Sequence, residues 1–170
     1  MFTLVIGGAA SGKSAWAETR ACSLPGQRIY LATMQPYGEE SRARIEKHRA
    51  QRAGKGFVTL ERYTDLAGSA VPTDSSVLLE DLANLLANET FSRDGGGSDA
   101  ALRGVESLRE RCAHLTVVTN ELFSGGASYE GETLLYLREL ARLNRLLAAR
   151  ADCVVELVCG LPNVLKGEVT

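Results

Sequence analysis

The chain has 170 residues, 45% of them hydrophobic and 24% charged, and a formal net charge of −2. This length suits one domain with its own core, so residues 1–170 are expected to form a single domain. The charge balance provides no global basic field for nucleic acid, and no apolar run approaches the roughly 20 residues that span a bilayer. The chain begins directly with a hydrophobic strand rather than a signal peptide, so a cytoplasmic protein is expected.

The four cysteines stand at positions 22, 112, 153 and 159 and form no Cys-x-x-Cys pair. Two of them, Cys153 and Cys159, lie in or beside an apolar segment. Buried free thiols are therefore expected, with disulfides or metal ligation as the alternative.

A phosphate-binding loop follows the first predicted strand, residues 3–6. The chain from Gly7 to Ser14 fits the pattern Gly-x-x-x-x-Gly-Lys-Ser. Its glycines permit backbone angles and close approach that a Cβ would block, and its amides form a nest for phosphate oxygens. Lys13 supplies a positive charge, and the Ser14 hydroxyl is placed to ligate Mg²⁺. The residues expected to contact the nucleotide are Gly7, Gly8, Ala9, Ala10, Ser11, Gly12, Lys13 and Ser14.

An ordinary glycine-rich turn with an unrelated lysine is the alternative. The strand before the loop and the helix-compatible residues 15–21 after it favour nucleotide binding, because the dipole of a helix starting near Lys13 also attracts phosphate.

Strands and helices alternate along the rest of the chain. The expected strands are 28–33, 57–61, 77–81, 115–121 and 153–158, the last ended by residues 160–162. The expected helices are 15–22, 38–52, one beginning at 82–86, 100–114 and 132–150. Residues 92–99 are expected as a loop or partly disordered insert, and Gly125 and Gly126 in the loop after the strand at 115–121. Because the strands are apolar throughout, the sequence predicts an α/β fold of the P-loop NTPase type, with a mostly parallel sheet and helices on both faces.

Ligands of such sheets bind at the carboxyl ends of the strands, where Gly7, Thr33, Glu80 and Asn120 are all expected. Glu80 ends an apolar strand, as the second Mg²⁺-handling element of a phosphate-loop protein would. Solvated acids at a strand end are the alternative. The candidate metal ligands are therefore Ser14 and Glu80.

The basic helix at 38–52 carries a second chemical signal. His48 has Arg44 and Arg52 one helical turn away. Surrounding cations disfavour protonation of the imidazole, which leaves a neutral nitrogen for nucleophilic attack, and they also suit a transferred phosphate. Taken alone, the charge pattern favours a plainer alternative, a solvated basic helix with an incidental histidine.

Several motifs occur together in a specific order: 7–14, Ala32-Thr33, 44–49, Thr59 with Glu61, 78–80, 119–121, 142–144 and 160–166. This set resembles the bifunctional adenosylcobinamide kinase / adenosylcobinamide-phosphate guanylyltransferase family over essentially the whole chain. The resemblance implies phosphorylation of adenosylcobinamide by ATP or GTP, followed by GMP transfer from GTP through a guanylylated histidine.

The resemblance also assigns residues. His48 would be the guanylylated histidine, residues 7–14 would hold the triphosphate, and Glu80 would act at the nucleotide or Mg²⁺. Together with Lys13 of the phosphate loop, His48 is a candidate catalytic residue. The positions that match those near the guanine nucleotide are Thr33, Met34, Arg49, Arg52 and Glu61. A homotrimer is implied, with a corrinoid substrate and no nucleic-acid partner.

Three segments depart from the family pattern: 122–128, Asn144-Arg145 and 136–139. They bear on corrinoid contacts more than on nucleotide chemistry. Two alternative functions therefore stay open, a small-molecule kinase without guanylyl transfer and a non-enzymatic nucleotide switch. The sequence lacks the Asn-Lys-x-Asp motif that a guanine-specific switch would carry.

Overall fold

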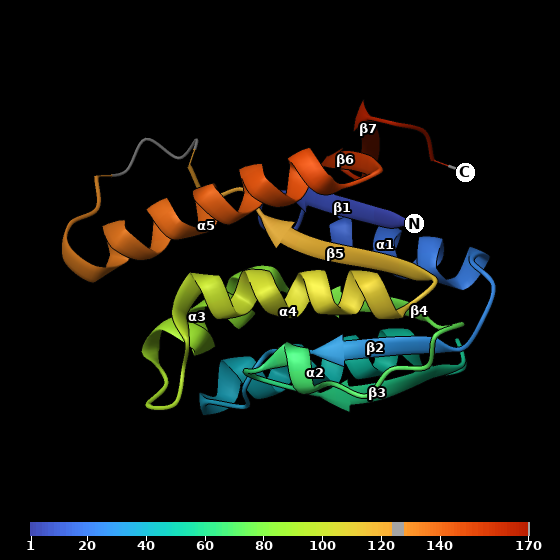
Figure 1. Cartoon of the computed structure of the whole chain (residues 1–170), viewed down its shortest axis with the longest axis horizontal. Helices are drawn as coiled ribbons and strands as arrows, with labels where there is room; N and C mark the ends of the chain where they lie inside the picture. Colours follow the sequence, from blue (N-terminus) through green and yellow to red (C-terminus); the bar gives the residue numbers. More distant parts are fainter. Residues whose placement is uncertain (124–127, 170) are drawn as a thin grey trace.

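The computed structural model describes residues 1–123 and 128–169, which contain one seven-stranded sheet with helices on both faces (Figure 1). The strands are β1 (Phe2–Gly7), β2 (Arg28–Ala32), β3 (Phe57–Glu61), β4 (Ser76–Glu80), β5 (His114–Asn120), β6 (Cys153–Val158) and β7 (Leu161–Lys166). Their order across the sheet is β3-β2-β4-β5-β1-β6-β7. All neighbouring strands are parallel except β6 and β7. The predicted α/β sheet is confirmed.

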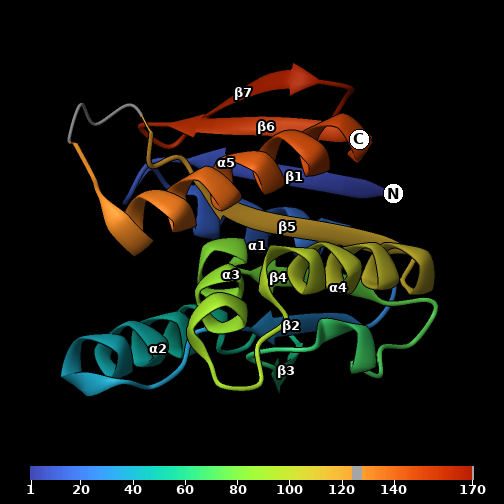
Figure 2. The same ribbon diagram turned by 60° about the vertical axis from the view of Figure 1, so that its left-hand side comes forward.

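The helices are α1 (Lys13–Ser23), α2 (Gly38–Arg52), α3 (Leu82–Phe91), α4 (Gly97–Arg111) and α5 (Gly131–Arg150), with a short 3-10 turn at Leu66–Gly68. One hydrophobic cluster packs α3, α4 and α5 on one face of the sheet, and a smaller one packs α1 on the other. Figure 2 shows α2 apart from α4 and α5, at one corner of the molecule. No helix within the described residues combines the length and apolarity needed to cross a membrane.

The predicted strand at 153–158 is confirmed as β6, but the prediction that it is the last strand was wrong, because β7 follows it and pairs with it antiparallel. The reason is the turn at Cys159 and Gly160, which have φ angles of 51° and 80°. Positive φ at both central residues is what a two-residue hairpin requires. Pro162 is tolerated because β7 is an edge strand.

The boundaries around the predicted loop at 92–99 also differ. Helix α4 begins at Gly97 and ends at Arg111, and His114 starts β5 rather than ending a helix. The buried Glu89 carboxylate accepts hydrogen bonds from the amides of Asp65 and Gly96, which anchors the start of α4. Gly125 and Gly126 lie outside the described residues.

Candidate active site

The phosphate loop joins β1 to α1 at the carboxyl edge of the sheet. At Gly7 a Cβ would come within 2.6 Å of Ser11 Oγ and 2.8 Å of the Leu157 carbonyl oxygen, so only glycine fits. At Gly12, φ is +93°, in the left-handed region that favours glycine. Gly7 and Gly12 therefore serve the loop conformation as predicted, whereas a Cβ on Gly8 would meet nothing within 4 Å, so the predicted need for glycine is not met there.

Lys13 is the first residue of α1, and its side chain reaches back to the loop. Its ammonium donates a hydrogen bond of 2.8 Å to the Gly8 carbonyl oxygen, and the side chain is buried. Burial lowers the pKa of Lys13, while the nearby Asp81 and Glu80 carboxylates act in the opposite direction. The charge is therefore held over the nest where phosphate oxygens would bind.

The β6–β7 turn supports the loop from outside. The Gly160 amide donates a 2.9 Å hydrogen bond to the Ser11 carbonyl oxygen. A Cβ on Gly12 would come within 3.1 Å of the Gly160 Cα. The hairpin that the sequence did not predict thus forms one wall of the loop.

Two residues predicted as metal ligands lie together. The Ser14 hydroxyl donates a hydrogen bond to Oε1 of Glu80, and Glu80 Oε2 is buried without a hydrogen-bond partner among the described residues. Burial raises the pKa of Glu80 to about 7, with the Ser14 hydrogen bond acting in the opposite direction. A hydroxyl beside a carboxylate oxygen in need of a partner fits Mg²⁺, whose other ligands are usually water and substrate phosphate.

Within residues 1–123 and 128–169 no group of three or more His, Cys, Asp or Glu could hold a metal ion. These residues therefore do not form a complete set of metal ligands by themselves. The arrangement instead suits a Mg²⁺ ion that arrives with a nucleotide.

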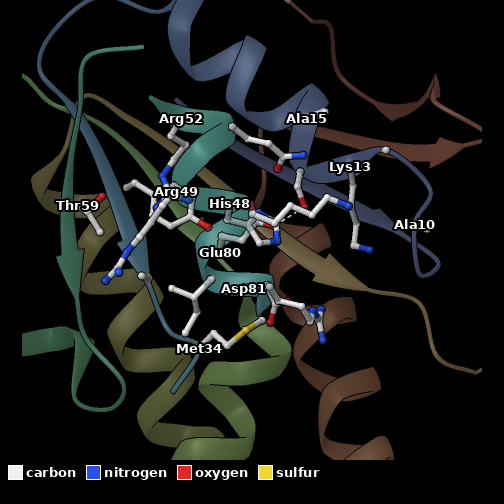
Figure 3. Close-up of a pocket in the computed structure, with 18 of the residues that line it drawn as sticks. Ala10, Lys13, Ala15, Met34, His48, Arg49, Arg52, Thr59, Glu80 and Asp81 are labelled. Atoms are coloured by element: carbon white, nitrogen blue, oxygen red, sulfur yellow. Dashed lines mark hydrogen bonds between the residues drawn. The ribbon is translucent and has the colours of Figure 1, made fainter. Parts of the chain in front are cut away.

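A cavity of about 430 Å³ opens beside the loop. It is lined by the loop, the carboxyl ends of β2, β4 and β5, part of β3, and α2. Figure 3 shows that the His48, Lys13 and Glu80 side chains converge on this space. The predicted site residues that line it are Ala9, Ala10, Ser11, Gly12, Lys13, Ser14, Met34, His48, Arg49, Arg52, Glu61 and Glu80.

Gly7, Gly8 and Thr33 do not belong to the lining of this cavity. Thr33 is fully buried, and its hydroxyl donates to the Asp81 carbonyl oxygen over 2.8 Å. It therefore holds the end of β2 against the residue that follows β4.

His48 is half-buried on α2. Burial is the main cause that lowers the pKa of His48, followed by the positive charge of Arg52, while Arg44 acts in the same direction. The cationic effect predicted from the sequence is thus present, but burial is larger. Both effects favour the neutral ring, which is the form that a nucleophile requires.

Arg49 and Arg52 make different contacts. Arg49 pairs with Glu61 of β3 at 2.9 Å, in an exposed ion pair, and Tyr63 also donates to Glu61. Arg52 is buried, and its guanidinium carbon lies 3.3 Å from the centre of the Tyr30 ring. Such stacking of a guanidinium on an aromatic face is favourable.

The sequence did not single out Tyr30 as a site residue, although it lines the cavity from β2. Asp81 also lines the cavity. Its Oδ1 accepts hydrogen bonds from the backbone amide and the side-chain amide of Asn84, so Asp81 caps the N-terminus of α3. An aromatic residue in a buried strand carries no local signal of a binding role, whereas the acid pair at the end of β4 did point here.

A phosphate loop at the carboxyl edge of a mostly parallel sheet, followed by an acid that bonds the loop serine, defines the P-loop class of nucleotide-binding proteins. A solved ATPase of the type III secretion system of pathogenic bacteria has a similar fold, with a TM-score of 0.53 at 11% sequence identity. The similarity covers 96% of this chain and 56% of that one.

Comparison of the amino-acid sequence with known proteins identifies the family of this chain. The chain belongs to the cobinamide kinase / cobinamide phosphate guanyltransferase family, whose model matches residues 3–165. It is similar to the bifunctional adenosylcobalamin biosynthesis protein CobP of Pseudomonas aeruginosa, with 34% identity over 99% of both chains. It is also similar to the bifunctional adenosylcobalamin biosynthesis protein CobU of Escherichia coli, with 33% identity over 98% of this chain and 100% of that protein. The resemblance inferred from the motifs is confirmed, and the chain is a transferase of this family.

Proposed function

We propose that this chain phosphorylates adenosylcobinamide with a nucleoside triphosphate and then transfers GMP from GTP to the new phosphate through His48. The observation that carries the proposal is that His48 of α2 and Lys13 and Ser14 of the phosphate loop line the same cavity. Family membership and the names of the two relatives supply the substrate class.

In the first step, the loop amides and Lys13 hold the outer phosphates of ATP or GTP. Most of the rate comes from positioning and from stabilising charge on the transferred phosphoryl group. Ser14 and Glu80 would hold a Mg²⁺ ion, whose charge would offset part of the negative charge of the phosphates.

In the second step, a neutral nitrogen of His48 attacks the α-phosphorus of GTP, and pyrophosphate leaves. A phosphate oxygen of the phosphorylated substrate then attacks the same phosphorus, and the histidine is released. Arg44, Lys47 and Arg49 line the cavity with His48 and supply positive charge for the phosphates. Met34, Arg49, Arg52 and Glu61 are proposed to surround the guanine nucleotide.

We further propose that the protein acts as a homotrimer in the cytoplasm. The edge strand β7 supports an oligomer, because Leu161, Val164 and Leu165 on it are exposed apolar residues. Exposed apolar side chains on an unpaired edge strand favour association. The free thiols of Cys22, Cys112, Cys153 and Cys159 are consistent with a reducing compartment.

The test is a chase experiment. The protein is incubated with GTP labelled at the α-phosphate and Mg²⁺, freed of nucleotide, and mixed with adenosylcobinamide phosphate. The proposal predicts protein-bound label that moves to the corrinoid. A kinase without guanylyl transfer would phosphorylate adenosylcobinamide but retain no label, and a nucleotide switch would do neither.

A further inference from the structure

Helix α2, which carries His48, is fastened to the rest of the fold mainly at its C-terminal end. Of its 15 residues only Arg52 is buried, and Arg52 stacks on Tyr30 of β2. Just past the helix, Lys55 forms a 2.6 Å ion pair with Oε2 of Glu18. The position of His48 relative to the phosphate loop therefore depends on these contacts.

Glu18 lies on α1, one turn beyond Ser14 and on the same face of the helix. Its side chain is 1% exposed, whereas that of Lys55 is 38% exposed. A buried carboxylate is costly unless both of its oxygens are compensated. Lys55 compensates Oε2, but Oε1 is buried without a hydrogen-bond partner in the described part of the chain.

His48 also has a buried polar atom that lacks a hydrogen bond. Its Nδ1 is buried without a partner among the residues described. Buried polar atoms in native proteins nearly always have a partner, so the unpaired atoms of Glu18, of His48 and of Arg52, whose Nη1 is likewise buried without a partner among the described residues, require an explanation. The Glu18 carboxylate raises the pKa of His48 more than Asp81 does, so it is the carboxylate that interacts most strongly with the ring.

We infer that Glu18 is the positioning residue for His48: its Oε2 fastens α2 through Lys55, and its Oε1 accepts the Nδ1–H of His48 during guanylyl transfer. The inference rests on the proposed function, because it concerns the step in which His48 carries GMP. Glu18 does not touch the nucleotide in this account and acts only through the histidine.

The proton stays on Nδ1 of His48 throughout the transfer. The Nε2 lone pair forms the bond to the α-phosphorus, and the bond to the bridging oxygen breaks, so that its electron pair leaves with pyrophosphate. The guanylylated ring then carries a positive charge, which the Glu18 carboxylate stabilises. When the substrate phosphate attacks, the N–P bond breaks and the electron pair returns to Nε2.

A hydrogen bond from Nδ1–H to a carboxylate also fixes the tautomer, so that the lone pair is on the nitrogen that attacks. Glutamine at position 18 can instead present an N–H group to Nδ1 and favour the wrong tautomer, as an amide does in place of the aspartate of a serine-protease triad. Glu18→Gln therefore separates orientation of the ring from simple packing.

The experiment compares the wild-type chain with Glu18→Gln, Lys55→Met and Lys55→Arg. The rate of GMP-adduct formation at saturating GTP is measured beside the ATP-dependent phosphorylation of adenosylcobinamide. Glu18→Gln is expected to slow adduct formation about 10- to 100-fold, the range for groups that orient metal-binding histidines, and to retain phosphorylation. Lys55→Met is expected to slow adduct formation, whereas Lys55→Arg keeps the charge and is expected to restore it.

An NMR titration of His48 gives a second readout that packing alone would not move. The chain has two histidines, so its ring signals are readily assigned with a His48→Ala control. The His48 pKa is expected to fall in Glu18→Gln, because a negative charge that favours the protonated ring has been removed.

Adduct formation at the wild-type rate in Glu18→Gln overturns the inference and leaves the proposed function intact. An equal loss of both reactions, or an unchanged His48 pKa, also overturns it, since either would assign Glu18 a purely structural role. Failure of the wild-type chain itself to form an adduct would instead overturn the proposed function.

Discussion

The Ser14 hydroxyl donates a hydrogen bond to Oε1 of Glu80, 66 residues further along the chain. This contact joins the phosphate loop to the end of β4 and leaves Glu80 Oε2 buried without a partner in the described residues. A carboxylate held in this way is unfavourable for the free protein and useful for a nucleotide-bound metal ion. Such conflicts between stability and function are common at active sites.

Replacing Glu80 tests whether its buried carboxylate lowers the stability of the free protein while supporting activity. Glu80→Gln keeps an acceptor for Ser14 but removes the buried charge, so the nucleotide-free variant should gain about 1–3 kcal/mol in free energy of unfolding above about pH 7. It should lose Mg²⁺-dependent phosphorylation. Denaturant unfolding and a kinase assay measure the two effects. A variant that is less stable yet fully active would refute this account of Glu80.

The sign of the pH effect follows from the pKa of Glu80, which is 4.5 ordinarily and about 7 in the fold. Between these values the folded state binds more protons than the unfolded state. The contribution of Glu80 to the wild-type free energy of unfolding therefore falls as pH rises through this window. Glu80→Gln should lack that part of the pH dependence.

The same group should make Mg²⁺ binding pH-dependent. A protonated Glu80 cannot ligate the ion, so affinity for Mg²⁺ in the presence of ADP should fall about tenfold per pH unit well below the Glu80 pKa. Calorimetric titrations from about pH 5.5 to about pH 8 measure this. Ser14→Ala serves as a control that weakens binding at every pH. An affinity independent of pH would show that Glu80 is not a ligand.

Two glycines of the loop form a matched pair of variants. Gly12→Ala forces a left-handed residue to carry a Cβ close to Gly160, so we expect a loss of about 1–3 kcal/mol and weaker ATP binding. At Gly8 a Cβ would meet nothing within 4 Å, so Gly8→Ala should retain its stability. Trp16 of α1, the single tryptophan, reports both unfolding and binding by fluorescence. Equal stability of the two variants would contradict the role given to Gly12.

The low pKa of His48 predicts a pH profile. Because burial and nearby arginines favour the neutral ring, adduct formation at a Mg²⁺ concentration that saturates the site at every pH should persist below pH 6.5, the ordinary pKa of histidine, and decline only in more acidic solution. Arg44→Gln removes one of these charges and should move the decline to higher pH. The rate of adduct formation measured across the acidic range checks both. A decline centred above pH 6.5 in the wild-type chain would contradict this description of the ring.

Local patterns were enough to predict much of this protein. The phosphate loop, the acid at the end of β4 and the basic helix α2 each carry their signal within a few residues. Strand β7 was missed because Gly160 and Pro162 mark the end of a strand in sequence, while the hairpin depends on positive φ angles at Cys159 and Gly160. The folded chain alone reveals this hairpin as a wall of the loop.

Glu18 and Tyr30 were missed for a different reason. Each lies in a regular helix or strand, and its importance comes from Lys55 or Arg52, which the fold brings to it. Sequence spacing on α2 identified the cations around His48 but not the burial that dominates its pKa. Burial depends on packing between elements, which a pattern within one helix does not contain.

The proposed mechanism depends on His48 carrying GMP between GTP and the substrate. Intact-mass spectrometry of the wild-type chain and of His48→Ala, each after incubation with GTP and Mg²⁺, tests it most directly. The wild-type chain is expected to gain the mass of one GMP, and His48→Ala is expected to gain none while still binding nucleotide. A GMP adduct of equal yield on His48→Ala would contradict it.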